Sequence, residues 1–259
     1  MSLPNWPHYD LETIEKVKNV LLSSKVNYWT GKEGREFEKE FAKYTGSNFA
    51  IAVSNGSLSL SCCYLASFLK KDDEVITTPR TFIATASSIS LLGAKPIFAD
   101  VDYYSGNITA KSIEPLITKK TKAISVVHLG GWPAEIFEIK ELADNYGLLV
   151  IEDCAQAHGA GYYKDNKFYS VGSLGDIASW SFCQDKIITT GGEGGMVTTN
   201  DQNIYDLIWS FKDHGKSLHK IQEKSKQGND YKLVHDTFGS NFRLTEIQSA
   251  IGRLQLRKL

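Results

Sequence analysis

The sequence contains few cysteines, and their spacing excludes the common structural zinc sites. Four occur in 259 residues, at Cys62, Cys63, Cys154 and Cys183, and none forms a C-x-x-C pair or has a histidine at metal-ligand spacing. Structural zinc needs such groups of ligands, so we expect no bound metal. In a reducing compartment these thiols are most simply interpreted as small buried apolar side chains.

The sequence also lacks a block of basic residues, a signal peptide and a long apolar run. The formal net charge is −1 and the pI is near 6.6, so nothing favours binding to nucleic acid or to an anionic membrane. The first residues, MSLPNWPHYD, have neither the basic nor the apolar region of a signal peptide. No apolar run reaches the roughly 18 residues that a membrane helix needs. We therefore expect a cytoplasmic protein that acts on small molecules, without membrane or nucleic-acid partners.

The composition that remains, 42% hydrophobic and 23% charged, is typical of a globular chain with one large α/β core. Short apolar runs alternate with helical patterns, which predicts right-handed crossovers and a mainly parallel sheet. Ligands of such sheets gather at the carboxyl ends of the strands. No G-x-G-x-x-G motif opens the first crossover, which argues against a nicotinamide-binding Rossmann domain.

Two linked segments between Leu148 and Met196 contain the residues most suggestive of chemistry. An apolar run stops at Asp153, as in a buried strand that delivers a carboxylate to the rim of a sheet. Lys186 lies between a strand end and a glycine cluster, where desolvation can lower the pKa of an amine toward nucleophilic use. An acid and a lysine placed in this way suit pyridoxal 5'-phosphate (PLP), because the acid keeps the pyridine nitrogen protonated and the lysine forms the Schiff base. Taken singly, such an acid is often only a helix cap, and such a lysine is usually a solvated surface charge.

Two more strand ends provide weaker candidates. A strand at residues 49–53 is followed by a turn containing Gly56 and Ser57 and then by a helix, and the free N–H groups of such a turn suit a phosphate. The same residue types are also common in ordinary turns that bind no ligand. Phe82 heads a helix predicted over residues 81–92, and a core position is its simpler interpretation from the sequence alone.

With these motifs in fixed order, the sequence resembles the DegT/DnrJ/EryC1/StrS family of PLP-dependent sugar aminotransferases. The resemblance extends from Trp29-Thr30-Gly31 through IED, SF, Lys186 and EGG to the final stretch GSNFRLTEIQSAIGRLQL. It implies a fold-type-I PLP-transferase large domain, which is a three-layer α/β fold with a mainly parallel mixed sheet. It also implies transamination from glutamate to a keto-sugar linked to a nucleoside diphosphate, in amino-sugar and surface polysaccharide biosynthesis.

The resemblance assigns catalytic roles by motif. Lys186 matches the Schiff-base lysine, Asp153 the partner of the pyridinium nitrogen, and Gln156 the residue beside the ring and its phenolic oxygen. The lysine also separates this chain from the family's sugar dehydratases, which have histidine at that position. The implied reaction is a ping-pong transamination in which Lys186 moves a proton.

The resemblance also assigns the remaining cofactor contacts. Gly56, Ser57 and Ser181 match contacts to the phosphate, and Phe82 matches an aromatic residue that stacks on the ring. Asn241 matches an asparagine that reaches the phosphate of the neighbouring subunit. The implied active unit is therefore a homodimer with shared active sites.

The chain departs from the family pattern at two places. The stretch IITTGG between Lys186 and Glu193 has one residue more than the common spacing, which we interpret as a subgroup variant. Family members also continue into a small C-terminal domain, which is absent here. We therefore expect residues 1–244 to form the PLP-binding large domain, with 1–46 as a helical segment packed on it. Residues 245–259 would begin the linker helix to the absent domain.

Two other classes of function stay open from the sequence alone. One is a truncated, catalytically inactive paralogue that acts only as a binding or dimerisation partner. The other is a different fold-type-I PLP enzyme, such as a lyase. The missing domain favours the first, whereas the intact Lys186, Asp153 and Gly56-Ser57 argue against it.

Overall fold

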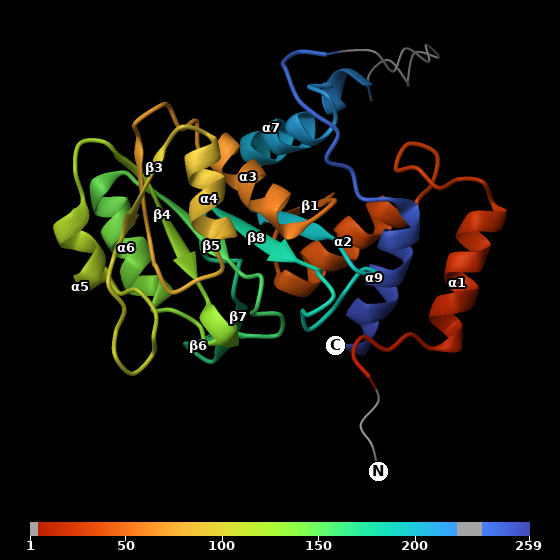
Figure 1. Cartoon of the computed structure of the whole chain (residues 1–259), viewed down its shortest axis with the longest axis horizontal. Coiled ribbons are helices and arrows are strands. Elements are labelled where there is room, and N and C mark those ends of the chain that lie inside the picture. The colour runs from red at the N-terminus through yellow and green to blue at the C-terminus, as the bar shows by residue number, and fades with distance from the viewer. Residues whose placement is uncertain (1–4, 222–234) are drawn as a thin grey trace.

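A seven-stranded sheet forms the middle layer of the molecule (Figure 1). The computed structural model describes residues 5–221 and 235–259. The strand order is β1-β9-β8-β5-β4-β2-β3. The strands are β1 (Phe49–Val53), β2 (Glu74–Thr77), β3 (Lys95–Phe98), β4 (Thr121–Val127), β5 (Leu149–Asp153), β8 (Ile177–Ser181) and β9 (Gly195–Thr199). In this sheet β9 is antiparallel to both of its neighbours and the other pairings are parallel, so the predicted mainly parallel mixed sheet is confirmed.

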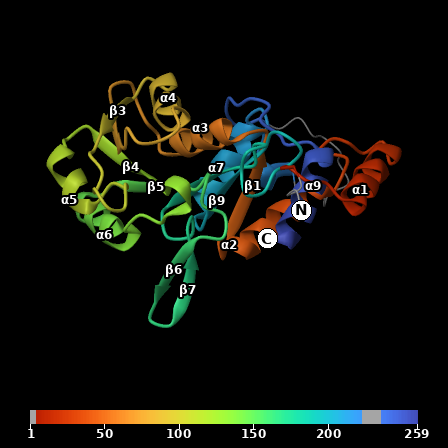
Figure 2. The ribbon, with the colours of Figure 1, turned by 60° about the horizontal axis from the view of Figure 1, so that its bottom comes forward.

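Helices cover both faces of the sheet, which gives the predicted three layers (Figure 2). On one face lie α3 (Gly56–Ala66), α4 (Ala84–Leu91) and α7 (Gln202–Lys212). On the other lie α2 (Glu33–Thr45), α5 (Ala110–Ile113) and α6 (Ile136–Tyr146), with the short turns η1 (Glu114–Leu116) and η2 (Leu129–Gly131) in the connections. Because both faces are covered, the central strands are buried on both sides and their apolar runs are nearly continuous.

The N-terminal and C-terminal helices pack together at the β1 end of the molecule (Figure 1). α9 (Glu246–Lys258) lies against α1 (Leu11–Leu22) and α2. Arg253 on α9 forms ion pairs of 2.6 Å with both Glu33 and Glu40 on α2. α2 therefore packs on the main body, and α1 and α2 both pack against the last helix.

The last helix packs through a small residue as well as through its apolar face. The sequence places Ile247, Ile251 and Leu254 on one face of this helix; Leu254 is buried, and Ile247 and Ile251 are half-buried. The close contact with α2 is made by Gly252, where an added Cβ would lie 2.6 Å from the ring of Phe37. A small residue at this point allows the helices to approach, which an apolar stripe does not reveal.

A two-stranded hairpin projects from the body (Figure 2) and was not predicted from the sequence. It consists of β6 (Gly161–Lys164) and β7 (Lys167–Ser170), joined by Asp165 and Asn166. Both turn residues have positive φ, which is the two-residue geometry that suits the twist of a hairpin.

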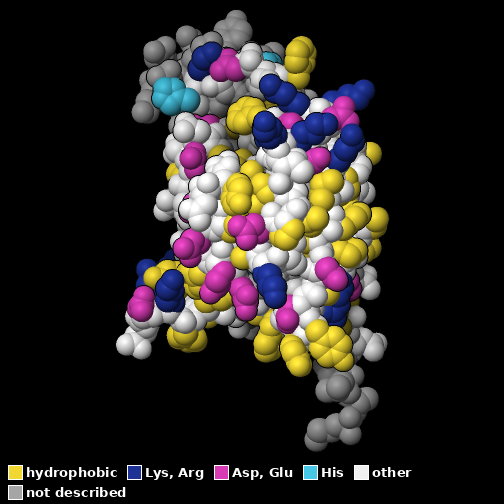
Figure 3. Space-filling view, turned by 90° about the vertical axis from the view of Figure 1, so that its left-hand side faces the viewer, with side chains coloured by type: hydrophobic (Ala, Val, Ile, Leu, Met, Phe, Trp, Pro, Cys, Tyr) yellow, Lys and Arg dark blue, Asp and Glu magenta, His cyan; other side chains and the backbone are white. Residues whose placement is uncertain are grey.

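Figure 3 shows the face at the β3 end of the molecule, where hydrophobic side chains lie among separate acidic and basic ones. Phe98 on the edge strand β3 is half exposed. The polar composition of residues 216–231 is typical of a loop or lid; residues 218–221 are helical, and residues 222–234 lie outside the described residues. Within the described ranges, no helix is both long enough and apolar enough to cross a membrane.

Candidate active site

The carboxyl ends of the parallel strands open onto one cavity of about 740 Å³. This is where the topology of an open α/β sheet places ligands. Seven of the residues expected from the sequence line it, from five separate segments of the chain: Gly56, Ser57, Phe82, Asp153, Gln156, Ser181 and Lys186.

Asp153 ends β5 and is a buried carboxylate on the cavity wall. Its Oδ2 accepts a hydrogen bond of 2.8 Å from the Thr85 hydroxyl, and its Oδ1 accepts one of 3.2 Å from the backbone N–H of Ala155. Burial raises the pKa of Asp153 above its ordinary value, although both hydrogen bonds oppose the shift. A proton donor or cation in the cavity would stabilise this carboxylate.

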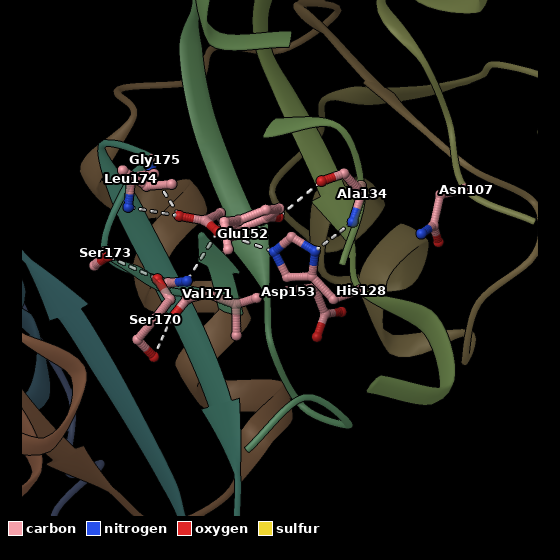
Figure 4. Close-up of polar contacts among 12 residues, drawn as sticks. Asn107, His128, Ala134, Glu152, Asp153, Ser170, Val171, Ser173, Leu174 and Gly175 are labelled. Carbon is pink, nitrogen blue, oxygen red and sulfur yellow. Dashed lines mark hydrogen bonds and ion pairs between the residues drawn. The ribbon is translucent and has the colours of Figure 1, made fainter. Parts of the chain in front are cut away.

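Glu152, the residue before Asp153, faces the opposite side of the strand, and the protein itself supplies the hydrogen-bond donors to its carboxylate. Figure 4 shows Glu152 directed toward His128 and the segment at residues 171–175, whereas Asp153 points away from them. Glu152 accepts hydrogen bonds from the N–H groups of Gly172, Leu174 and Gly175, at 2.8, 3.1 and 2.5 Å. Burial alone would raise the pKa of Glu152, but the contact with His128 and the backbone donors hold it below its ordinary value.

The first turn of α3 forms one end of the cavity. Asn55 caps the helix, and its side chain accepts a hydrogen bond of 2.9 Å from the N–H of Leu58. The N–H groups at Gly56 and Ser57 have no acceptor within the helix and lie at its positive end. An added Cβ at Gly56 would lie 2.6 Å from Cβ of Ser181, so glycine allows the helix end to meet β8. The result is a cradle of N–H and hydroxyl donors with the character of an anion site.

Lys186 lies in the connection between β8 and β9, opposite the Asp153 wall of the same cavity. Its side chain retains 17% of its possible exposure, and Nζ is 2.9 Å from the carboxylate of the adjacent Asp185. The glycine cluster follows closely, with Gly191 and Gly192 at positive φ, a conformation that favours glycine. The amine is therefore accessible from the cavity and held by one neighbouring charge.

Phe82 corrects the simpler interpretation of the sequence. It is 69% exposed and lines the cavity, so it is not a core residue. The reason is local, because α4 begins at Ala84 and not at residue 81 as predicted, which leaves Phe82 before the helix. A flat, exposed aromatic ring on this wall has the form needed to stack on a planar ligand.

Two side chains of this wall were missed by the sequence-based assignment. Thr85 donates to Asp153, and its own oxygen accepts from Thr81 at 2.8 Å. His128 directly follows β4 and lines the cavity beside Asp153. Thr85 stands in the helix predicted over residues 81–92, and the position of His128 just after the buried strand β4 was the available signal.

Asn241 does not line this cavity. It is exposed, its backbone pairs with Asp213 in an isolated bridge, and its side chain accepts a hydrogen bond of 3.3 Å from the N–H of Arg243. Within one chain it therefore makes no contribution to the site.

One group of potential metal ligands is formed by buried residues at this wall, His128, Glu152 and Cys154. Both nitrogens of His128 already form hydrogen bonds, to Glu152 at 2.9 Å and to the N–H of Ala134 at 3.1 Å. Burial also raises the pKa of Cys154, which favours the thiol over the metal-binding thiolate. These ligand atoms are engaged by the protein, so we do not assign a metal to them.

The cavity residues fit PLP in four respects. Buried Asp153 forms no ion pair with any of the described residues, and its raised pKa suits a protonated ring nitrogen as the partner. The α3 cradle matches a phosphate, and Phe82 matches a flat ring. Lys186 is an amine within the same cavity. The donor set thus suits a planar, phosphorylated cofactor that is attached through an amine.

Comparison with known proteins agrees with this geometry. A GDP-perosamine synthase from Escherichia coli O157:H7 is 41% identical over 244 residues, which cover 94% of this chain and 61% of that protein. The crystal structure of an aminotransferase from Psychrobacter cryohalolentis superposes with a TM-score of 0.91 at 50% identity, covering 99% of this chain and 64% of that one. NtdA from Bacillus subtilis, whose structure contains bound PMP, is 28% identical with a TM-score of 0.83, covering 96% of this chain and 53% of that one.

The matches leave part of each relative uncovered. The chain spans 59–62% of the length of the curated relatives that it matches. Within this span the agreement is continuous, because the pattern of one family matches residues 7–259. The chain belongs to the DegT/DnrJ/EryC1/StrS aminotransferase family.

Proposed function

We propose that this protein is a PLP-dependent aminotransferase that moves an amino group from glutamate to a keto-sugar linked to a nucleoside diphosphate. The observation that carries the proposal is the convergence of Asp153, Lys186 and the first turn of α3 on one cavity. Similarity to a GDP-perosamine synthase supports a nucleotide-linked sugar as the acceptor. The product would be an amino-sugar precursor of a surface polysaccharide.

The residues of the cavity would divide the binding of PLP among them. The N–H groups at Gly56 and Ser57 and the Ser181 hydroxyl would hold the phosphate, and Phe82 would lie on the face of the ring. Gln156 would contact the phenolic oxygen. When bound, PLP supplies an electron-withdrawing ring that stabilises negative charge beside the transferred nitrogen and carries the amino group between two substrates.

Asp153 and Lys186 would handle the protons of the reaction. Asp153 would hold a proton at the pyridine nitrogen, and its contacts with Thr85 and Ala155 fix the carboxylate that does so. The Lys186 amine would provide the covalent attachment and would then move a proton at the substrate carbon that bears nitrogen. The adjacent Asp185 carboxylate, 2.9 Å from Nζ, would stabilise the amine when it takes up that proton.

We further propose a homodimer in which the phosphate contact is completed by a second copy of the chain. The support is the position of Asn241, which is exposed and outside the cavity of its own chain. Residues 1–244 would be the cofactor-binding domain, and residues 245–259 would be a linker helix that follows it.

The test is a titration of the purified protein with PLP, followed by addition of glutamate. We expect a visible absorbance band of the bound cofactor, bleaching of that band by glutamate, and its return on addition of a nucleotide-linked keto-sugar. Lys186→Ala should lose the band, whereas Lys39→Ala, which removes an exposed lysine paired with Glu36, should keep it. A band that glutamate leaves unchanged would contradict the aminotransferase assignment and leave only cofactor binding.

A further inference from the structure

His128 is completely buried and held between two partners from different parts of the chain (Figure 4). Its Nδ1 is 3.1 Å from the N–H of Ala134, and its Nε2 is 2.9 Å from Oε2 of Glu152. A backbone N–H can only donate, so Nδ1 accepts and carries no proton. Nε2 therefore carries the ring proton and donates it to Glu152. The imidazole is locked as a single neutral tautomer.

The contact with Ala134 closes a loop. The loop runs from His128 at the end of β4 to Ala134 before α6, and it turns through Gly130 and Gly131, both at positive φ. The Tyr162 hydroxyl donates to the carbonyl of Ala134 at 2.7 Å. Both the N–H and the carbonyl of Ala134, at the far end of the loop, are therefore hydrogen-bonded. The near end is held because the N–H of His128 donates to the carbonyl of Asp153 at 3.1 Å.

This closed loop directs one donor at a residue of the cavity. The N–H of Gly130 donates to Oε1 of Gln156 at 2.8 Å. Because the carbonyl oxygen of Gln156 is engaged in this way, the NH₂ end of the amide is the end left for a ligand. A ligand group that meets Gln156 is therefore offered a hydrogen-bond donor.

We propose that His128 is a positioning residue that closes the loop over residues 129–134, so that Gly130 orients the Gln156 amide with its NH₂ group toward the phenolic oxygen of the cofactor. The inference rests on the proposed function, because it takes PLP as the occupant of the cavity. It adds the requirement that His128 closes the loop, although His128 is not among the residues proposed to hold the cofactor. Removing the closure should act on the cofactor only through Gln156.

The matched variants exploit the two nitrogens of the imidazole. In His128→Asn, Oδ1 takes the place of Nδ1, so the contact with Ala134 is retained and the donation to Glu152 is lost. In His128→Gln, the amide nitrogen takes the place of Nε2, so the donation to Glu152 is retained and the loop is released. The two substitutions thus separate the closure from the buried contact with Glu152.

The experiment measures the pH midpoint of the visible absorbance of bound PLP, together with the thermal unfolding of the cofactor-free protein. A donor at the phenolic oxygen favours its deprotonated form, so Gln156→Ala should raise the midpoint by about one pH unit. His128→Gln should raise it by a similar amount, and His128→Asn should stay near the wild type. The double variant of His128→Gln and Gln156→Ala should raise the midpoint no further than Gln156→Ala alone.

Glu152→Gln provides a second route if His128→Gln does not fold. Its amide NH₂ opposite Nε2 favours the ring with its proton on Nδ1, which cannot accept from the N–H of Ala134, so the midpoint should rise; an unchanged midpoint would overturn the proposal. An unchanged midpoint in His128→Gln, with Gln156→Ala shifted, would overturn the proposal, as would additive shifts in the double variant. An unshifted midpoint in Gln156→Ala would also overturn it. By contrast, failure of the wild type to attach PLP would refute the proposed function itself.

Discussion

The two neighbouring carboxylates of β5 are both buried, yet their surroundings are opposite. Glu152 accepts hydrogen bonds from three backbone N–H groups and faces His128, and its pKa is held below the ordinary value despite burial. Asp153 accepts only from Thr85 and Ala155 among the described residues, and burial raises its pKa. The carboxylate of Glu152 has its hydrogen-bond donors within the protein. The carboxylate of Asp153 faces the cavity and forms no ion pair with any of the described residues.

The difference separates a structural carboxylate from a functional one. Successive residues of a strand point to opposite faces, so one strand can place one acid in the packed wall and the next in the cavity. The Glu152 side should therefore control stability, and the Asp153 side should control chemistry. Substitutions on the two sides can test this division directly.

The largest expected effect lies on the cavity side, at Lys186. Lys186→Ala should abolish covalent attachment of PLP while leaving the fold intact, because Lys186 is only partly buried on the cavity wall and its contact with Asp185 is exposed. Borohydride reduction followed by mass spectrometry measures the attachment, and circular dichroism checks the fold. Reduced cofactor found on a different lysine would contradict the assignment.

Asp153→Asn should separate chemistry from binding. Asparagine can hydrogen-bond to the ring nitrogen but cannot hold a proton there, so turnover should fall by about 10²-fold, or roughly 3 kcal/mol of barrier. Cofactor affinity should change far less. Single-turnover deamination of glutamate is the measurement, and an unchanged rate would show that Asp153 does not act on the ring nitrogen.

Glu152→Gln should have its main effect on stability. The substitution turns an acceptor for several donors into an amide whose NH₂ group meets donors, so the free energy of unfolding should fall by about 2 kcal/mol. Denaturant unfolding of the cofactor-free protein gives the value. Asp153→Asn is the matched control, and it should cost little or stabilise the protein, because it removes a buried charge without a cationic partner. Equal losses in both variants would remove the distinction between the two acids.

The smallest expected effect is the pH dependence of these stabilities, which should have opposite signs. The folded-state pKa of Glu152 is lowered from 4.5, so its contribution is present above that pH and is lost as the pH falls through the lowered value. The pKa of Asp153 is raised from 3.8, so its contribution is complete below that pH and is lost as the pH rises through the raised value. In unfolding measured against pH, the deficit of Glu152→Gln should shrink as the pH falls below about 4.5, and the gain of Asp153→Asn should grow as the pH rises above about 3.8. Parallel curves would contradict the assignment.

Much of the architecture and of the candidate site followed from local sequence. Apolar runs with a period of two or continuous burial marked the strands, and β1 and β9 were predicted with their observed bounds, Phe49–Val53 and Gly195–Thr199. Asp153 and Lys186 were identified because strand ends and glycine turns are properties of contiguous residues. The convergence of their segments followed from the rule that parallel strands end at one edge.

The sequence by itself determined the alternation of strands and helices along the chain, the class of sheet and the family motifs, because these depend on residues that are close together in the sequence. Only the tertiary structure decided which polar groups meet. Thr85 reaches Asp153 across 68 positions, and His128 meets Glu152 across 24, because sheet order and helix placement bring distant segments together. It also decided that Phe82 faces the cavity and that Glu152 is satisfied while Asp153 is not. Hydrogen-bond partners depend on distances between non-neighbouring residues, and no local pattern of residue types contains those distances.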